Sequence, residues 1–139
     1  MKIAVIGGGA AGFFAAISCR NHFPNSQVTI LEKSSKVLSK VKISGGGRCN
    51  VTNACFDNKK LSQHYPRGEN QLRKAFEQFN TANTMQWFEE KGVKLKVYPD
   101  NCVFPFSNDS QSIIGCFLSE VKRLDIKVEF NQRIQRIVQ

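Results

Sequence analysis

Three glycines near the amino terminus have the spacing of a turn that binds a pyrophosphate. They are Gly7, Gly9 and Gly12, in the order G-x-G-x-x-G, and they follow the apolar run Ile3–Ile6. In this pattern the first glycine permits a sharp turn and the second lets the backbone approach a phosphate closely. The third lets the following helix pack against the sheet. The amides that begin this helix, at Ala10 and Ala11, would then bind the anion.

An acidic residue lies where such a turn needs one. A second apolar run, Gln27–Leu31, ends in Glu32. This position is about 20 residues after the last glycine, where dinucleotide folds place a carboxylate that accepts hydrogen bonds from the ribose hydroxyls. Because a carboxylate there would repel a 2′-phosphate, FAD or NAD fits better than NADP.

A second glycine-rich stretch follows. Three consecutive glycines and then polar side chains describe a backbone that a ligand approaches closely, although a flexible surface loop explains the same residues equally well. The stretch consists of Ser44, Gly45, Gly46, Gly47, Arg48, Cys49 and Asn50. Basic residues without an acid among them surround it, and they form either a solvated face or a field that attracts a pyrophosphate. They are Lys33, Lys36, Lys40, Lys42 and Arg48.

The composition is that of a folded domain with an anionic partner. The chain has 139 residues, of which 41% are hydrophobic and 22% charged, so it is long enough for one core and does not have the composition of a disordered chain. The net charge of +9 admits nucleic acid, a membrane surface or a phosphate-bearing cofactor as partner. No RNA-binding motif is recognisable, which disfavours nucleic acid.

The cysteines and the apolar segments indicate a cytoplasmic protein without a membrane partner. The five cysteines are odd in number, contain no C-x-x-C pair and lack zinc-ligand spacing, which favours reduced thiols and predicts no metal site. The apolar run from Ile3 to Ile17 imitates a signal peptide, but its glycines interrupt it. No other stretch is long and apolar enough to span a bilayer.

The elements that position these residues alternate between strand and helix, which predicts an α/β fold of the Rossmann type. In the helix expected over residues 70–79, Leu72, Ala75, Phe76 and Phe79 have core spacing. Residues 57–68 are polar and read as a loop. Strands are expected at 3–6, 27–31, 94–98, 102–104, 126–130 and 134–138, and helices at 10–22, 70–79, 81–91 and 110–124. Because a doubly wound sheet usually needs more strands, we expect a piece of a longer chain.

The two glycine stretches resemble the N-terminal part of the FAD-dependent flavoproteins known as the BaiN-like or aminoacetone-oxidase-like family. The most specific match is Ile43–Asn53, supported by Gly7–Gly12, Leu31–Lys33, Lys40 and Val103–Ser107. The resemblance covers essentially the whole chain, but family members are much longer. It implies that residues 1–139 are the N-terminal part of a FAD-binding Rossmann-like domain, with a substrate domain and a C-terminal return outside this chain.

The resemblance also implies roles for single residues. Gly7, Gly9, Ala11 and Gly12 would hold the pyrophosphate, and Glu32 the adenosine ribose. Lys33 and Lys40 would lie along the cofactor, the stretch Ser44–Asn50 would line its flavin end, and Ile134 would present backbone groups to the adenine. The sequence departs from the family pattern at Leu38-Ser39, where glycine and a basic residue are common, and at Asn101-Cys102.

The implied function is that of an FAD-dependent oxidoreductase. It would pass hydride or electrons between a small-molecule substrate and NAD(P)H or oxygen, with Arg48 near the flavin, although this piece alone is expected to be inactive and its catalytic residues stay unassigned. A non-catalytic FAD- or NAD-binding module and a flavin-dependent tRNA-modifying protein are alternatives. A disulfide reductase using Cys49 and Cys55 is another, but their spacing is C-x5-C where that class has C-x4-C.

Overall fold

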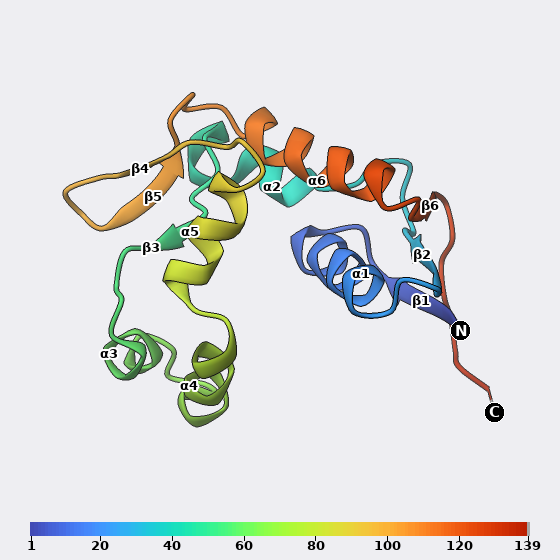
Figure 1. Ribbon diagram of the computed structural model, residues 1–139, viewed down its shortest axis with the longest axis horizontal. Coiled ribbons are helices and arrows are strands. Elements are labelled where there is room, and N and C mark those ends of the chain that lie inside the picture. Colours follow the sequence, from blue (N-terminus) through green and yellow to red (C-terminus); the bar gives the residue numbers. More distant parts are fainter. Residues whose placement is uncertain (139) are drawn as a thin grey trace. The chain divides into compact units, whose positions relative to one another are not determined.

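The computed structural model describes residues 1–138, and the chain divides into two compact units (Figure 1). Unit 1 consists of residues 1–43 together with the segment from residue 114 onward, and unit 2 consists of residues 44–113. Among the described residues, every helix is too short or too polar to span a bilayer.

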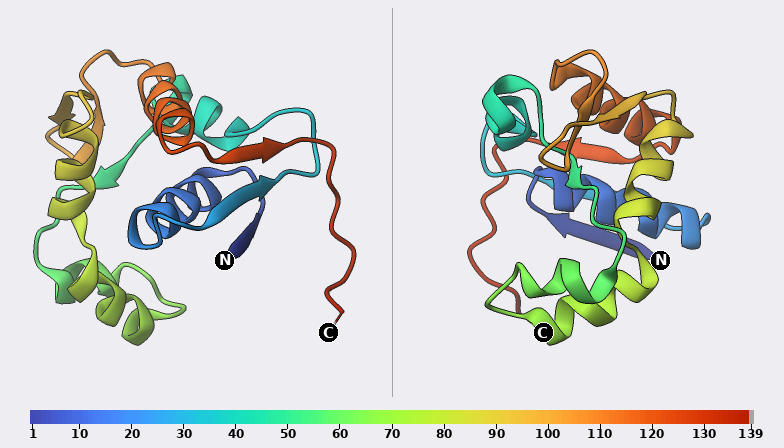
Figure 2. Two further views of the ribbon diagram at one scale, coloured as in Figure 1. Left: turned by 45° about the vertical axis from the view of Figure 1, so that its right-hand side comes forward. Right: turned by 90° about the vertical axis from the view of Figure 1, so that its left-hand side faces the viewer.

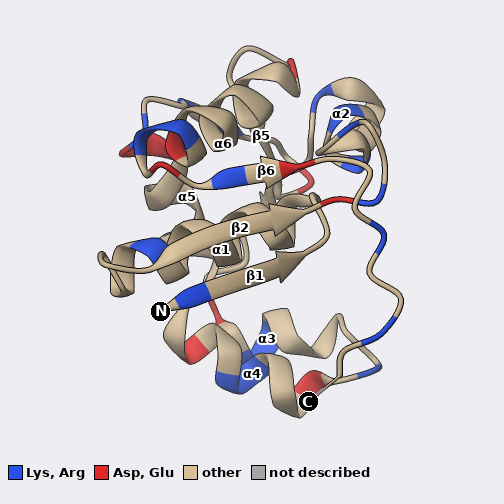
Figure 3. Ribbon diagram, turned by 90° about the vertical axis from the view of Figure 1, so that its right-hand side faces the viewer, with Lys and Arg blue, Asp and Glu red and all other residues tan. Residues whose placement is uncertain are grey.

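Unit 1 is built on a parallel sheet. Its strands are β1 (Lys2–Ile6), β2 (Gln27–Leu31) and β6 (Lys127–Glu129), in the order β1-β2-β6. Figure 3 shows the three strands running the same way, with blue basic residues where β1 and β6 begin and red acidic residues where β2 and β6 end. The carboxyl ends of the strands, where ligands of such sheets bind, are therefore the acidic edge.

Helix α1 (Ala10–His22) links β1 to β2, and the part of α6 (Gln111–Arg123) that belongs to unit 1 packs against it. The contact is between Phe13 and Phe117, both buried, whose rings meet edge to face at 5.9 Å. Val28 and Ile30, on the inward face of β2, complete this core. The alternation of buried and more exposed residues along β2 is that expected for a strand covered on one face.

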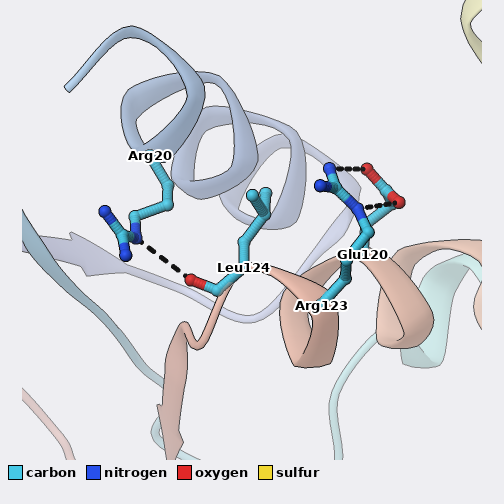
Figure 4. Close-up of polar contacts among 4 residues, drawn as sticks. All are labelled: Arg20, Glu120, Arg123 and Leu124. Atoms are coloured by element: carbon cyan, nitrogen blue, oxygen red, sulfur yellow. Dashed lines mark hydrogen bonds and ion pairs between the residues drawn. The ribbon is translucent and has the colours of Figure 1, made fainter. Parts of the chain in front are cut away.

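Polar contacts involve the residues near the ends of α1 and α6 (Figure 4). The Arg20 side chain on α1 donates from Nε to the carbonyl oxygen of Leu124, at 3.0 Å, which satisfies a carbonyl just beyond the end of α6. On α6 itself, Arg123 and Glu120 form a two-point ion pair with a shortest distance of 2.8 Å.

Unit 2 combines a small antiparallel sheet with three helices. The strands β3 (Thr52–Asn53), β4 (Leu95–Val97) and β5 (Cys102–Pro105) lie in the order β3-β5-β4, with the buried Val103 at the centre. The helices are α3 (Asn58–Gln63), α4 (Glu69–Gln78) and α5 (Thr81–Glu89). In both views of Figure 2, α3 and α4 lie side by side.

Most of the predicted elements are confirmed, and three expectations are wrong. Core spacing is found at Leu72, Ala75, Phe76 and Phe79, but none of these residues is buried. Residues 57–68 are not all loop, because Asp57 caps α3 by accepting hydrogen bonds from the amides of Lys59 and Lys60, and Leu61 is buried. The expected strand at 134–138 does not form: Ile137 is 82% exposed, and within the described residues β6 pairs with β2 alone. A strand needs a partner for its amides and carbonyls, which an apolar sequence alone does not supply.

Candidate dinucleotide site

The first glycine turn has the geometry that its spacing predicts. Gly7 has a φ of +105°, a left-handed conformation that favours glycine, and its amide donates to the carbonyl oxygen of Leu31 at 2.9 Å. A Cβ on Gly12 would overlap the carbonyl oxygen of Gly7. Gly12 therefore allows α1 to start directly against the end of β1.

The space beside Gly9 is open. Gly9 is the N-cap of α1, and a Cβ built there would meet no atom within 4 Å. The amides of Ala10 and Ala11 belong to the first turn of α1, which carries no acidic residue. Together with the macrodipole of a 13-residue helix, these amides form a partial positive charge that suits a phosphate.

Glu32 lies at the end of β2 and is held by backbone and side-chain donors. Its Oε2 accepts a hydrogen bond from the Gly8 amide at 2.7 Å, and its Oε1 accepts two from Ser34 at 2.9 Å, one from the amide and one from the hydroxyl. These bonds, led by that of Gly8, lower the pKa of Glu32, and the charge of Lys33 adds to the effect. The carboxylate is therefore ionised and fixed beside the glycine turn.

Three backbone bonds brace the chain around Glu32. The amide of Glu32 donates to the carbonyl oxygen of Glu129, and its carbonyl oxygen accepts from Gln132, both at 2.8 Å. The amide of Leu38 donates to the carbonyl oxygen of Gly8, also at 2.8 Å. Leu38 is buried and has a φ of +55°, a backbone conformation that favours glycine.

Gly8 also belongs to this candidate site, although the glycine spacing did not single it out. Besides donating to Glu32, it has no room for a side chain, because a Cβ would lie 2.6 Å from Val37 and 3.1 Å from the Glu32 carboxylate. The sequence feature that could have indicated Gly8 is the run of three consecutive glycines. The G-x-G-x-x-G pattern uses only the first and third of them. The other predicted residues of unit 1 are less constrained: Lys33 and Lys40 are exposed, and Ile134 lies in an irregular segment.

The second glycine stretch, in unit 2, is a compact turn. The φ values of Gly45, Gly46 and Gly47 are +56°, +68° and +86°, so three successive residues adopt a conformation that favours glycine. A Cβ on Gly45 would lie 2.7 Å from the ring of Phe104 and 2.9 Å from the amide of Asn50. The carbonyl oxygen of Gly47 accepts a hydrogen bond from the amide of Ser110 at 2.9 Å. Tertiary contacts thus hold the turn.

Arg48 follows this turn and is held by aromatic rings. Its guanidinium carbon lies 4.1 Å from the ring centroid of Phe104 and 5.7 Å from that of Tyr98, and its Nε donates to the carbonyl oxygen of Gly45 at 3.2 Å. Tyr98 is in turn fixed by a 2.8 Å hydrogen bond from its hydroxyl to Asn108. Arg48 therefore presents a positioned positive charge beside the glycine turn of unit 2.

The cysteines near this turn are free thiols. All five cysteines are free, including Cys49 and Cys55. Cys49 is buried, and this burial raises the pKa of its thiol, opposed by a hydrogen bond with Ser44. A raised pKa disfavours the thiolate that thiol–disulfide chemistry needs. At the other end of the stretch, Asn50 donates from Nδ2 to Cys102 Sγ at 3.5 Å.

A parallel sheet, a glycine turn into a helix and an acid at the end of the second strand define a Rossmann-like domain of the kind that binds FAD or NAD(P). The chain belongs to the family described as the HI0933-like protein Rossmann domain, whose model matches residues 1–139. This confirms the resemblance to BaiN-like flavoproteins.

The chain is similar to one curated protein and to one solved structure. It is 29% identical over 136 residues to the 3-dehydro-bile acid delta(4,6)-reductase of Clostridium scindens, an alignment that covers 98% of this chain and 32% of that protein. The chain thus spans about a third of the length of this relative. The crystal structure of Thermovibrio ammonificans THI4 is similar with a TM-score of 0.58 and 12% identity, covering 93% of this chain and 37% of that one, which supports the fold alone.

Proposed function

We propose that this chain binds FAD and supplies the flavin-binding part of an oxidoreductase. The observation that carries the proposal is the contact between the glycine turn and the end of β2, in which the Gly8 amide donates to the ionised Glu32 carboxylate at 2.7 Å beside the start of α1. Free amides for a pyrophosphate and a fixed acceptor for ribose hydroxyls are the two things that the adenosine half of FAD requires.

The residues present fit the cofactor. The open space at Gly9 admits a phosphate close to the backbone, and α1 has no acid in its first turn to repel it. Glu32 accepts the ribose hydroxyls and disfavours a 2′-phosphate, so FAD or NAD fits better than NADP. Lys33 and Lys40 would lie along the cofactor, and Ile134 would present its backbone to the adenine, as the resemblance implies.

In unit 2, the turn Gly45–Gly47 and Arg48 would line the flavin. FAD, when bound, supplies hydride and electron transfer. Arg48, which Phe104 holds in place, would stabilise negative charge on the reduced ring system or on the pyrophosphate. We propose that the partners are a small-molecule substrate and either NAD(P)H or oxygen, and that the activity belongs to a longer protein like the bile-acid reductase relative. A cytoplasmic location stays a prediction.

The test is mass spectrometry of the nucleotide released when the protein is denatured, before and after incubation with FAD, NAD or NADP. We expect FAD to be retained in preference to the other two. Retention of none of them, even after incubation, would contradict the proposal. A second experiment uses this chain joined to the rest of its protein. If that protein binds FAD, but NAD(P)H does not reduce the flavin and oxygen does not reoxidise it, the result would favour the non-catalytic module.

A further inference from the structure

A pocket of about 340 Å³ lies within unit 2. Its lining residues are distant in the sequence from the glycine turn of unit 1. Its walls come from α3, α4, the start of α5 and the segment around β3. The size is at the lower end of the range, about 300–1,000 Å³, that small-molecule sites occupy. The residues that line the pocket include Asn50, Thr52, Asn53, Tyr65, Phe76 and Phe79.

One wall of the pocket is aromatic. The rings of Tyr65 and Phe76 lie 6.1 Å apart, and Phe79 follows at the end of α4. The spacing of Phe76 and Phe79 predicts core residues, but α4 has no buried residue, and Phe79 and Tyr65 are 37% and 44% exposed. Large aromatic side chains that stay exposed and border a hollow are typical of a binding surface.

Polar residues also line the pocket, and two of them are held by hydrogen bonds. The hydroxyl of Thr81 donates to the carbonyl oxygen of Asn53 at 3.0 Å, and that of Thr84 donates to the carbonyl oxygen of Asn80 at 2.9 Å. Among residues 1–138, by contrast, the hydroxyl of Thr52 and the side-chain amide of Asn53 have no hydrogen-bond partner in the protein. They are available to bond a carbonyl or hydroxyl group of a ligand.

No residue that lines this pocket is charged, although the chain has 20 basic and 11 acidic residues. A charged ligand would lose hydration there without gaining a counter-charge, so the lining selects an uncharged one. A larger hollow of about 480 Å³ in unit 1 differs in this respect, because Arg20, Asp125 and Lys127 line it. It also lies where β2 and β6 begin, whereas ligands of parallel sheets bind where the strands end.

We propose that the unit 2 pocket binds an uncharged, flat ring compound that carries a carbonyl or hydroxyl group. Its rings lie against Tyr65, Phe76 and Phe79, and its oxygen faces Thr52 and Asn53. Asn50, the last residue of the second glycine stretch, also borders the pocket. That the compound is the substrate rests on the proposed function, which places this stretch at the flavin.

The test is titration of the ¹⁵N-labelled chain with 1-tetralone, a neutral two-ring ketone, and with 1-naphthoate, an anion of similar size. We expect saturable shifts of amide signals in β3 and α5 with the ketone, and binding of the anion weaker by about tenfold or more. Failure of 1-tetralone to bind, or equal binding of the two compounds, would overturn the proposal.

Variants locate the site. Phe79→Ala is expected to weaken binding of 1-tetralone about tenfold, and Thr52→Val about threefold, since the first removes a ring contact and the second a hydrogen-bonding group. Phe79→Leu keeps an apolar side chain if the alanine variant misfolds, and its expected loss is smaller. Phe130→Ala, at a residue that is 42% exposed and outside the pocket, is the matched control.

Unchanged binding in folded Phe79→Leu and Thr52→Val proteins would overturn the location. FAD content is measured on the same samples. If the protein retains FAD but does not bind 1-tetralone, only the proposal about the pocket is contradicted. If the chain binds 1-tetralone but takes up no FAD, the proposed function is contradicted, and with it the substrate role of the pocket.

Discussion

The amide of Gly8 donates a 2.7 Å hydrogen bond to Oε2 of Glu32, and this bond joins the glycine turn after β1 to the end of β2. The carboxylate is thereby fixed before any ligand arrives. A preorganised acceptor loses little conformational entropy on binding, which favours affinity for the ribose hydroxyls.

Glu32→Gln is expected to weaken FAD binding on the order of tenfold to a hundredfold, because hydrogen bonds to a charged acceptor are stronger than those to an amide. Isothermal titration calorimetry with FAD measures the effect. Glu129→Gln, at the other acidic strand end of unit 1, is the control and should bind FAD like the unmodified protein. Equal losses in the two variants would point to a general charge effect.

The same carboxylate makes stability depend on pH. The pKa of Glu32 is lowered from 4.5 in the folded chain, so its contribution is present above that value and is lost as the pH falls through the lowered pKa. The unmodified protein should therefore exceed Glu32→Gln in stability at neutral pH, and the difference should shrink on acidification. Urea denaturation at several pH values checks this, and a difference that grows in acid would contradict it.

Two glycine substitutions should separate folding from binding. Gly12→Ala places a Cβ against the carbonyl oxygen of Gly7 and is expected to cost about 1–3 kcal/mol of unfolding free energy. Gly9→Ala meets nothing within 4 Å and should leave stability nearly unchanged while blocking the approach of a phosphate. Denaturation curves and FAD titrations of both variants test the pair. A Gly9→Ala protein with normal affinity for FAD would exclude the proposed pyrophosphate position.

Arg48→Ala is expected to make the flavin potential more negative, because it removes a positive charge that stabilises the reduced cofactor. A loss of about 1.4 kcal/mol corresponds to about 30 mV for a two-electron couple. Arg48→Lys keeps the charge but loses the stacking on Phe104, and should show a smaller shift. Lys96→Ala removes another cation, 5.1 Å from the ring of Tyr98, and serves as control. Unchanged potentials and FAD affinities in both Arg48 variants would rule out this role.

Cys49 should react slowly with iodoacetamide at neutral pH. Its thiol is buried and its pKa is raised from 9.0, so the reactive thiolate becomes abundant only above that pH. Peptide mass mapping of the labelled protein measures the rate, with the less buried Cys55 in the same sample for comparison. Rapid labelling of Cys49 after mild reduction alone would revive the disulfide-reductase alternative.

Phe117→Ala should destabilise unit 1 by about 3–5 kcal/mol, since it deletes a buried ring that packs edge to face on Phe13. Phe130→Ala removes a ring that is 42% exposed and should cost much less. Chemical denaturation followed by circular dichroism gives both values. A small effect of Phe117→Ala would mean that α6 contributes little to the core of unit 1.

Local signals in the sequence predicted much of unit 1. Gly9 precedes α1, and Pro24 lies between the end of α1 and the start of β2. Such glycine and proline signals act within a few residues, so the sequence predicts the bounds of both elements. The roles of Gly7 and Gly12 in the turn were predicted for the same reason. The strand expected at 134–138 failed because pairing depends on a distant partner. Helix α3 was missed because Leu61 is its one apolar residue, so its sequence shows no hydrophobic period.

The amino-acid sequence by itself determined the class of site, because a glycine fingerprint and an acid at a set distance carry their chemistry in a short stretch of chain. Only the tertiary structure decided how Gly45, Arg48 and Phe104 fit together, and that Phe76 and Phe79 border a pocket rather than fill a core. The physical reason is that burial and ring contacts depend on which segments meet in space, and residues near one another in the chain do not specify those meetings.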